Sequence, residues 1–253
     1  MSDVIAIIPA RYGSTRFPGK ALADRTGRPL IQHVYEQARQ ARALSQVMVA
    51  TDDVRIEQAV RGFGGTAVMT RPDHPNGTSR LAEAAETISA ASGDPVIVNV
   101  QGDEPEIEPA HIDMAVEAFL GSEDDRTRMG TLAAPFQPDE DPHNTNIVKV
   151  VLDRQGRALY FSRAPIPHVR DPEEHTSIEV LKHVGLYVYR RSFLAEYARW
   201  IPTPLEQAEQ LEQLRVLENG FAVVAARVEA VHHGIDTPDQ YDEFVTRWKQ
   251  QHG

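Results

Sequence analysis

Apolar runs and helical patterns alternate along the first 120 residues of the chain. Short apolar runs of strand length occur at residues 4–8, 47–50, 67–69 and 96–100. Between them, as at residues 29–44, apolar positions recur three or four residues apart, which is the spacing of an amphipathic helix. This alternation predicts a mostly parallel sheet with helices on both faces. Uninterrupted apolar runs are typical of parallel strands that are buried on both sides.

The pattern changes after a predicted helix at residues 111–120. Strand-like runs then occur at residues 129–135, 148–152, 158–161 and 183–189, and they predict a β-rich lobe at about residues 129–190. One further helix is expected to begin at a capping box of Thr203 and Glu206 and to end at Gly220. A last strand at residues 221–228 and a helix from residue 237 complete the chain. We expect a single α/β domain, which suits a length of 253 residues.

The composition excludes several classes of function. The chain has 26 Lys and Arg against 37 Asp and Glu, a formal net charge of −11, which argues against broad binding to nucleic acids or to an anionic membrane. The absence of cysteine excludes disulfides, cysteine zinc sites and thiol nucleophiles. No stretch approaches the roughly 20 apolar residues of a membrane helix, and the run at residues 4–8 is too short for a signal peptide. We therefore expect a cytoplasmic protein without a nucleic-acid or membrane partner.

The segment after the first predicted strand has the opposite charge to the chain as a whole. Between Val4 and Ala23 there are three basic residues and no acidic one: Arg11, Arg16 and Lys20. Such a glycine-punctuated loop offers backbone N–H groups, hydroxyls and cations to phosphate groups. It lacks the spacing of a Walker loop. A solvated surface loop is the alternative interpretation.

Two aspartates follow predicted strands. Asp103 comes after the run at residues 96–100, and Asp236 lies where the last strand leads into the last helix. In open parallel sheets, ligands bind beyond the carboxyl ends of the strands. Carboxylate oxygens there suit Mg²⁺, although a turn or a helix cap is the commoner role of such an aspartate. Two carboxylates facing a basic phosphate loop would describe metal-assisted phosphoryl or nucleotidyl transfer.

Other candidate motifs are weaker. Residues 74–80 form a loop entering a helix, which could contact a nucleobase or serve only as a helix start. The ten histidines form no His-x-x-x-His pair, so a zinc site is not favoured. His183 precedes an apolar run and could equally be a core histidine. A serine hydrolase is not favoured, because the glycine-flanked serine of a nucleophile elbow is missing.

Six segments, in order along nearly the whole chain, resemble a known family. They are IIPARYGSTRFPGK at 7–20, VNVQGDEP at 98–105, YFSRAPIP at 160–167, KHVGLY at 182–187, LEQLR at 211–215 and GIDTP at 234–238. Together they are similar to the motifs of the 3-deoxy-manno-octulosonate cytidylyltransferase family. The resemblance implies a Rossmann-like nucleotidyltransferase fold and a homodimer with the β-rich lobe at the subunit contact.

The resemblance also implies roles for individual residues. The residues implied for the CTP triphosphate are Arg11, Ser14 and Lys20. Those implied around cytidine are Pro9, Ala10, His74, Gly77 and Arg80. Those implied as Mg²⁺ ligands are Asp103 and Asp236. Those implied to line the acceptor-sugar pocket are Gln101, Arg163, His183, Tyr187, Glu212 and Gln213.

The implied reaction transfers CMP from CTP to a small acidic acceptor, foremost 3-deoxy-D-manno-octulosonate, and releases pyrophosphate. Its catalytic residues would be Arg11, Lys20, Asp103 and Asp236, and no general base is singled out. A phosphonate or a modified ulosonic acid is an alternative acceptor, and UTP or GTP is an alternative donor. A catalytically dead nucleotide-binding module is a more remote alternative. The chain departs from the family where Asn76, Gly77, Thr78 and Ser79 replace the usual Ser-Gly-Thr followed by an acid.

Overall fold

The structure is a computed structural model that describes residues 3–89, 93–171, 179–229 and 234–252. The chain folds into two compact units. The first unit consists of Met1–Asp113 and His232–Gly253, and the second of Met114–Val231. The last helix of the chain therefore belongs with the N-terminal residues.

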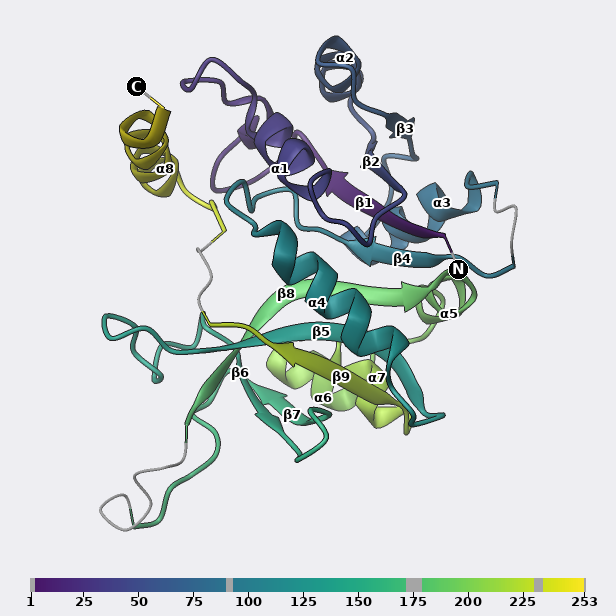
Figure 1. Ribbon diagram of the computed structural model, residues 1–253, viewed down its shortest axis with the longest axis vertical. Helices are drawn as coiled ribbons and strands as arrows, with labels where there is room; N and C mark the ends of the chain where they lie inside the picture. Colours follow the sequence, from purple (N-terminus) through teal and green to yellow (C-terminus); the bar gives the residue numbers. More distant parts are fainter. Residues whose placement is uncertain (1–2, 90–92, 172–178, 230–233, 253) are drawn as a thin grey trace. The chain divides into compact units, whose positions relative to one another are not determined.

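The first unit contains a parallel sheet. Its strands are β1 (Val4–Ala10), β2 (Gln46–Thr51), β3 (Ala67–Met69) and β4 (Val96–Asn99), in the order β3-β2-β1-β4 (Figure 1). In the centre, Ile7 of β1 lies opposite Met48 of β2 and Asn99 of β4. All residues of β4 and nearly all of β1 are buried, so both faces of these strands are covered. The apolar runs thus predicted these strands correctly.

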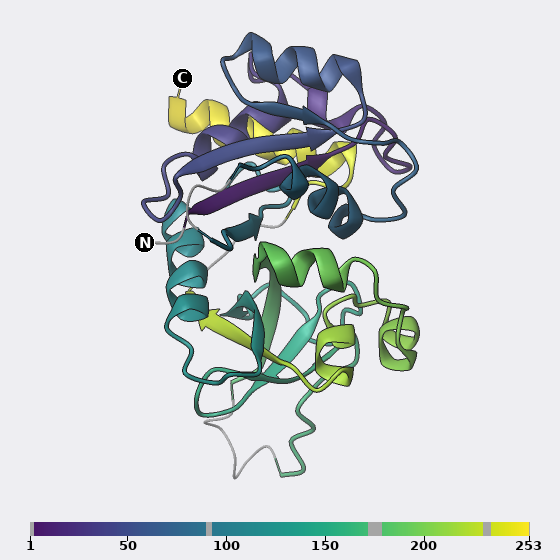
Figure 2. The same cartoon turned by 90° about the vertical axis from the view of Figure 1, so that its right-hand side faces the viewer.

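Helices flank this sheet. They are α1 (Leu30–Ala38), α2 (Val54–Gly62), α3 (Gly77–Glu86) and α8 (Pro238–His252), with a short 3₁₀ helix η1 (Lys20–Leu22). The helix α4 (Pro109–Leu120) contains the boundary between the units. Figure 2 shows α8, in yellow, within the first unit. There Tyr241, Phe244 and Val245 form a buried cluster with Leu30 of α1 and Ile235. Because of this packing, α8 holds the preceding segment, residues 234–237, against the first unit.

The second unit is built around mixed strands. They are β5 (Thr127–Pro135), β6 (Lys149–Leu152), β7 (Ala158–Ser162), β8 (Leu181–Arg190) and β9 (Ala222–Arg227). Strand β5 pairs antiparallel with β8 and parallel with β9, while β6 pairs antiparallel with β7 and β8. The predicted β-rich lobe lies within this unit. The helix α5 (Arg191–Tyr197) was not predicted from the sequence.

The prediction of one helix from Pro204 to Gly220 was wrong. Two helices occupy this stretch, α6 (Pro204–Glu209) and α7 (Leu214–Glu218), and Gln210 between them is left-handed with φ 53°. A non-glycine residue pays a steric penalty in this conformation, so other contacts must stabilise it. Arg163 supplies them, donating from Nε to the Glu209 carbonyl at 2.7 Å and from a terminal nitrogen to the Gln210 carbonyl at 3.3 Å. The predicted start is confirmed, since Glu206 accepts the Thr203 N–H at 3.1 Å.

The predicted fold class is confirmed. The chain is a mixed α/β protein whose sheet is mostly parallel, with helices packed against the strands. In the part of the chain that the structure describes, no helix combines the length and the apolar character needed to span a membrane. The single-domain organisation stays a prediction.

Candidate active site

The basic loop after β1 is folded around Tyr12. The Tyr12 carbonyl accepts hydrogen bonds from the N–H groups of Ser14 and Gly19, both at 3.0 Å. Gly19 has φ 73°, and a Cβ there would lie 3.2 Å from the Tyr12 ring, so this turn favours glycine. The Arg55 guanidinium lies 3.4 Å from the centroid of the same ring. The loop ends at Lys20, the first residue of η1.

Lys20 connects the two aspartates that the sequence singled out. Its Nζ atom lies 2.9 Å from Oδ2 of Asp103 and 3.3 Å from Oδ1 of Asp236, and it also donates to the Ile235 carbonyl at 2.5 Å. The Lys20 side chain is 14% exposed, against 30% and 40% for the two aspartates. Arg16 adds a second cation, 2.9 Å from Oδ2 of Asp236. Two cations and two carboxylates therefore form one network.

The backbone fixes the spacing between the two aspartates. The Ile235 N–H donates to the Asp103 carbonyl at 2.8 Å, and Ile235 is buried against α1 and α8. The Gln240 side chain accepts the N–H groups of Asp236 and Thr237 at 2.7 and 3.0 Å. The position of Asp236 is thus set by the docking of α8.

Glu104, next to Asp103, is in an unusual electrostatic environment. Burial, with a further contribution from the Asp103 charge, raises the pKa of Glu104 to about 8. A protonated Glu104 at neutral pH removes one negative charge from this segment. This pKa shift could not be predicted from the sequence, because it depends on burial.

The residues expected around cytidine gather at the end of β1 and the start of α3. Pro9 and Ala10 end β1, and a Cβ on Gly77 would lie 3.7 Å from the Pro9 ring. His74 is held by the Ser79 hydroxyl at 3.1 Å and by Glu83. The two ring nitrogens of His74 are thereby both engaged.

Arg80 on α3 and Asn76, which precedes this helix, are both fixed by hydrogen bonds. The buried Arg80 guanidinium donates to the Thr70 hydroxyl at 2.6 Å and pairs with Asp52 at 3.1 Å. The Asn76 side chain accepts the Ser79 N–H at 2.9 Å and caps α3. The departure from the family pattern at Asn76 therefore supplies a standard N-cap.

The second unit brings together three of the six residues expected to contact the acceptor, namely His183, Tyr187 and Gln213. The Tyr187 hydroxyl donates to Oε1 of Gln213 at 3.4 Å, and the Tyr187 and His183 rings lie 5.5 Å apart. The His183 Nε2 atom lies 2.9 Å from the Thr131 hydroxyl. Burial lowers the pKa of His183 to about 3, so this ring is neutral at pH 7.

Gln213 stands out in this group. Its side chain is buried, and within the described part of the chain its Nε2 atom has no hydrogen-bond partner. A buried amide donor without a partner is costly and needs an explanation. Arg163 and Glu212 instead make main-chain contacts: Arg163 binds the Thr145 carbonyl at 2.9 Å in addition to the α6–α7 turn, and the Glu212 carbonyl accepts from Tyr197 at 2.7 Å.

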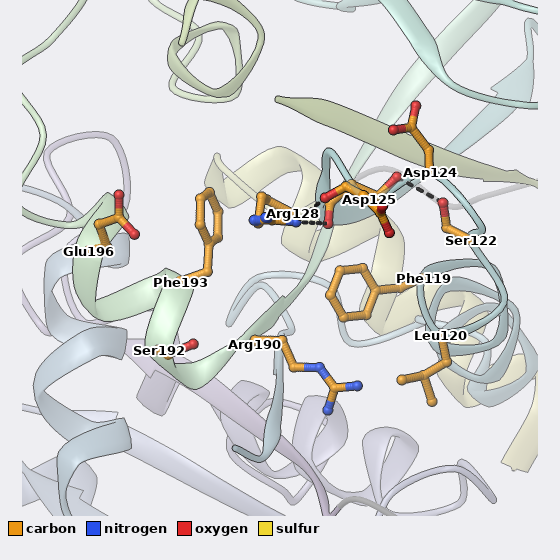
Figure 3. A pocket seen from close by; sticks show the side chains of 11 residues that line it. Phe119, Leu120, Ser122, Asp124, Asp125, Arg128, Arg190, Ser192, Phe193 and Glu196 are labelled. Atoms are coloured by element: carbon orange, nitrogen blue, oxygen red, sulfur yellow. Dashed lines mark hydrogen bonds between the residues drawn. The ribbon is translucent and has the colours of Figure 1, made fainter. Parts of the chain in front are cut away.

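A cavity of about 500 Å³ also lies in the second unit. Figure 3 shows Phe119, Arg128, Arg190 and Phe193 on its walls, and Arg128 donates to the Asp125 carbonyl at 2.5 Å. Its lining mixes arginines with the carboxylates of residues 124, 125 and 196. None of the predicted site residues, all of which the structure describes, lines this cavity.

Comparison with known proteins identifies the family. Residues 5–229 match the family model described as cytidylyltransferase. A protein of Geobacter metallireducens is 52% identical over 96% of this chain and 97% of its own length, and one of Geobacter sulfurreducens is 53% identical over 98% and 100%. Both are named 3-deoxy-manno-octulosonate cytidylyltransferase. The chain belongs to this cytidylyltransferase family.

A solved structure supports the assignment of this cytidylyltransferase. It is CMP:2-keto-3-deoxy-manno-octonic acid synthetase complexed with CTP, which is 42% identical and superposes with a TM-score of 0.90 over 99% of this chain and 100% of its own. The predicted family and the predicted class, a CTP-dependent nucleotidyltransferase, are both confirmed.

The sequence assigned no individual role to Arg16. Arg16 was predicted only as one of the three loop cations, and the family resemblance implied no ligand for it. Its contact with Asp236 depends on α8 bringing that carboxylate to the loop, which no local pattern reveals. The available signal was the absence of acidic residues between Val4 and Ala23, which marked the loop as basic but indicated no partner for Arg16.

Proposed function

We propose that this cytidylyltransferase transfers CMP from CTP to 3-deoxy-D-manno-octulosonate and releases pyrophosphate. The observation that carries the proposal is the position of Lys20, from a basic loop at the end of β1, between the carboxylates of Asp103 and Asp236. A phosphate-binding loop next to two carboxylates, beyond the ends of parallel strands, is the arrangement that nucleotidyl transfer requires. The names of the relatives support the choice of nucleotide and acceptor.

In this proposal the first unit binds CTP. Arg11, Ser14 and Lys20 bind the triphosphate, whose negative charges match the basic loop. The cytidine is surrounded by Pro9, Ala10, His74, Gly77 and Arg80. The His74 ring and the Arg80 guanidinium are both held by hydrogen bonds, which supports this role, since preorganised groups lose little freedom on binding.

Asp103 and Asp236 are proposed to hold Mg²⁺. One nitrogen atom lies within hydrogen-bonding distance of both carboxylates, so a single cation can reach both. Across the described residues there is no group of three or more His, Cys, Asp or Glu side chains suited to a metal. Mg²⁺ is typically held by one or two carboxylates together with substrate phosphates, and this donor set fits it. When bound, Mg²⁺ supplies positive charge that stabilises a reacting phosphate group.

The acceptor is proposed to contact the residues that the family resemblance implies, namely Gln101, Arg163, His183, Tyr187, Glu212 and Gln213. The unpaired Nε2 donor of Gln213 supports this role, because an acceptor hydroxyl or carboxylate would satisfy it. The neutral His183 ring can exchange a hydrogen bond with a sugar hydroxyl without adding charge.

The reaction exchanges one bond to phosphorus for another. An acceptor oxygen bonds to the α-phosphorus of CTP, the bond from that phosphorus to the pyrophosphate oxygen breaks, and the proton of the acceptor hydroxyl passes to water. Arg11 and Lys20 neutralise the charge of the phosphates, and positioning of the two substrates supplies much of the remaining acceleration.

A steady-state assay of pyrophosphate release tests the proposal. With CTP and Mg²⁺, we expect release to require 3-deoxy-D-manno-octulosonate and to be much slower with phosphonoformate. UTP and GTP should replace CTP poorly. Release with a phosphonate and none with the ulosonic acid would reassign the acceptor, and CTP binding without turnover would indicate an inactive module.

Two further predictions concern the protein as a whole. A homodimer and a cytoplasmic location follow from the family resemblance and the sequence, and both stay predictions. Light scattering on the purified protein checks the first, since a dimer has twice the mass of a 28.2 kDa chain.

A further inference from the structure

We propose that Lys20 acts as a resident counter-cation of Asp103 and Asp236, which it leaves for the triphosphate only when a divalent cation takes its place. The inference rests on the proposed function, because it assigns metal binding to the same two carboxylates. It adds a step that precedes catalysis, in which the binding of a divalent cation moves Lys20 from the two carboxylates to the triphosphate.

The hydrogen bonds of Lys20 exclude simultaneous phosphate binding. A lysine ammonium has three N–H donors. In the structure these donors meet three acceptors, namely Asp103 Oδ2, the Ile235 carbonyl and Asp236 Oδ1. An ammonium in this position has no donor left for a phosphate oxygen. Lys20 must therefore move before it can serve the role proposed for it with CTP.

The charges give the reason for the movement. Lys20 and Arg16 together balance the two carboxylates. A divalent cation between the carboxylates would lie close to the ammonium and repel it. Lys20 carries its charge on a flexible four-carbon stem, and Gly19 before it is at φ 73°, outside the helical region. The displaced Lys20 ammonium can then bind the negatively charged triphosphate.

Lys20 also stabilises the two carboxylates before the metal binds. Two partly buried carboxylates held near one another repel, and an ammonium between them removes this cost. Lys20 thus keeps the two aspartates at a spacing that a single cation can use. The consequence is competition: in the absence of nucleotide, Lys20 and a divalent cation compete for the same oxygens.

Titration with Mn²⁺, followed by the electron paramagnetic resonance signal of the free ion, tests this competition without nucleotide or turnover. Lys20→Met removes the charge and keeps most of the stem, so we expect about tenfold tighter Mn²⁺ binding than in the wild type, the change produced by losing one close charge contact. Lys20→Arg keeps a competing cation and should bind Mn²⁺ about as weakly as the wild type.

Arg11→Met is the matched control. It removes the same charge from the same loop, and among the described residues Arg11 makes no hydrogen bond or ion pair with either aspartate. We expect its Mn²⁺ affinity to stay within about twofold of the wild type, since an exposed charge without a close partner is largely screened. An equal gain in Arg11→Met and Lys20→Met would overturn the proposal, because it would reveal only a general charge effect.

Asp103→Asn separates this inference from the metal site itself. Loss of Mn²⁺ binding in Asp103→Asn, with no change in Lys20→Met, would overturn the counter-cation role and leave the metal site intact. Unchanged Mn²⁺ binding in Asp103→Asn would overturn both. Circular dichroism and thermal melting of each variant exclude misfolding as the cause of an altered affinity.

Discussion

A Cβ atom on Gly102 would lie 2.6 Å from the backbone carbonyl oxygen of Pro9. Pro9 lies near the end of β1 and Gly102 follows the neighbouring parallel strand β4, so the two segments leave the sheet side by side. They approach this closely because residue 102 has no side chain. The basic loop continues from Pro9 and Asp103 follows Gly102, so this contact sets the distance between the loop and the carboxylate.

We expect Gly102→Ala to be inactive or nearly so. The new methyl group would meet backbone rather than a flexible side chain, so one segment must move, at a cost of about 1–3 kcal/mol in stability. A displacement of about 1 Å in a catalytic group can lower turnover by about 10²-fold. Urea unfolding and pyrophosphate release measure the two effects.

Gly62→Ala is the control for this change. Gly62 ends α2, and a Cβ there meets nothing within 4 Å. We expect unchanged turnover and a stability equal to or slightly above that of the wild type. Wild-type turnover in Gly102→Ala would show that the close approach to Pro9 is not needed for the site.

Lys20→Ala should lower turnover by roughly 10²–10³-fold. This is the range observed when one preorganised charged or polar contact to a reacting group is lost. Lys249→Ala removes an equal charge from the exposed face of α8 and should leave turnover unchanged. Near-normal turnover in Lys20→Ala would contradict its assignment to the triphosphate.

Local patterns predicted the parallel strands because the physical cause is local. A strand buried on both faces favours an apolar residue at nearly every position, and residues 4–8 and 96–100 follow this with the single exception of the buried Asn99. The break between the helices α6 and α7, in contrast, could not be predicted from the local pattern. Their joint is the left-handed Gln210, whose neighbouring carbonyls are bound by the distant Arg163, so the helical pattern of the sequence continued through a real break.

The candidate site was likewise predicted only in part. The family motifs gathered its residues into a single set, and the charge pattern drew attention to the basic loop. The link between Asp103 and Asp236 depends on Ile235, which bonds to the Asp103 backbone and packs beneath α8. Such contacts join segments that are far apart in the sequence, so the spacing of residue types along the chain does not predict them.

Asn76→Ala should destabilise the protein by about 1 kcal/mol. The Asn76 side chain accepts the Ser79 N–H at the start of α3, and alanine cannot replace this bond. Asn76→Ser restores the residue common in the family and keeps a capping oxygen, so its stability should stay within a few tenths of a kcal/mol of the wild type. Urea unfolding compares the three proteins, and equal stability of Asn76→Ala and Asn76→Ser would contradict the capping role.

Arg215→Met should be among the more destabilising single changes in the second unit. Arg215 and Glu206 form a buried ion pair, and Arg215 also donates to the carbonyls of Tyr197 and Trp200 at 3.3 and 3.2 Å. Removing the arginine leaves the Glu206 charge buried without its partner, at a cost of about 3–5 kcal/mol.

The exposed Arg199 provides the comparison for this pair. Arg199→Met should change stability by less than about 0.5 kcal/mol, because the side chain is on the surface. Urea unfolding measures both variants. An effect of Arg215→Met no larger than that of Arg199→Met would mean that the buried pair contributes little.

His33 makes the stability of the first unit dependent on pH. The buried ring shares a 2.7 Å hydrogen bond with Thr26 and packs edge-on against Phe244 and Trp248, with centroids 5.2 and 5.7 Å away. Burial, and then the positive charge of Arg28, lower the pKa of His33 from 6.5 to about 4. The nearby carboxylates of Glu36 and Glu106 oppose this shift only in part.

The sign of the pH effect follows from these two pKa values. Between pH 6.5 and about 4, the unfolded chain binds a proton at this histidine and the folded protein does not, so stability is lost as the pH falls. At about 1.4 kcal/mol for each unit of pKa shift, the loss reaches about 3 kcal/mol at pH 4. Urea unfolding of the wild type and of His33→Gln, which does not titrate, isolates this contribution from those of the carboxylates. We expect the wild type to lose about 3 kcal/mol relative to His33→Gln between pH 7 and 4; parallel curves for the two proteins would show that His33 is protonated equally in the folded and unfolded states.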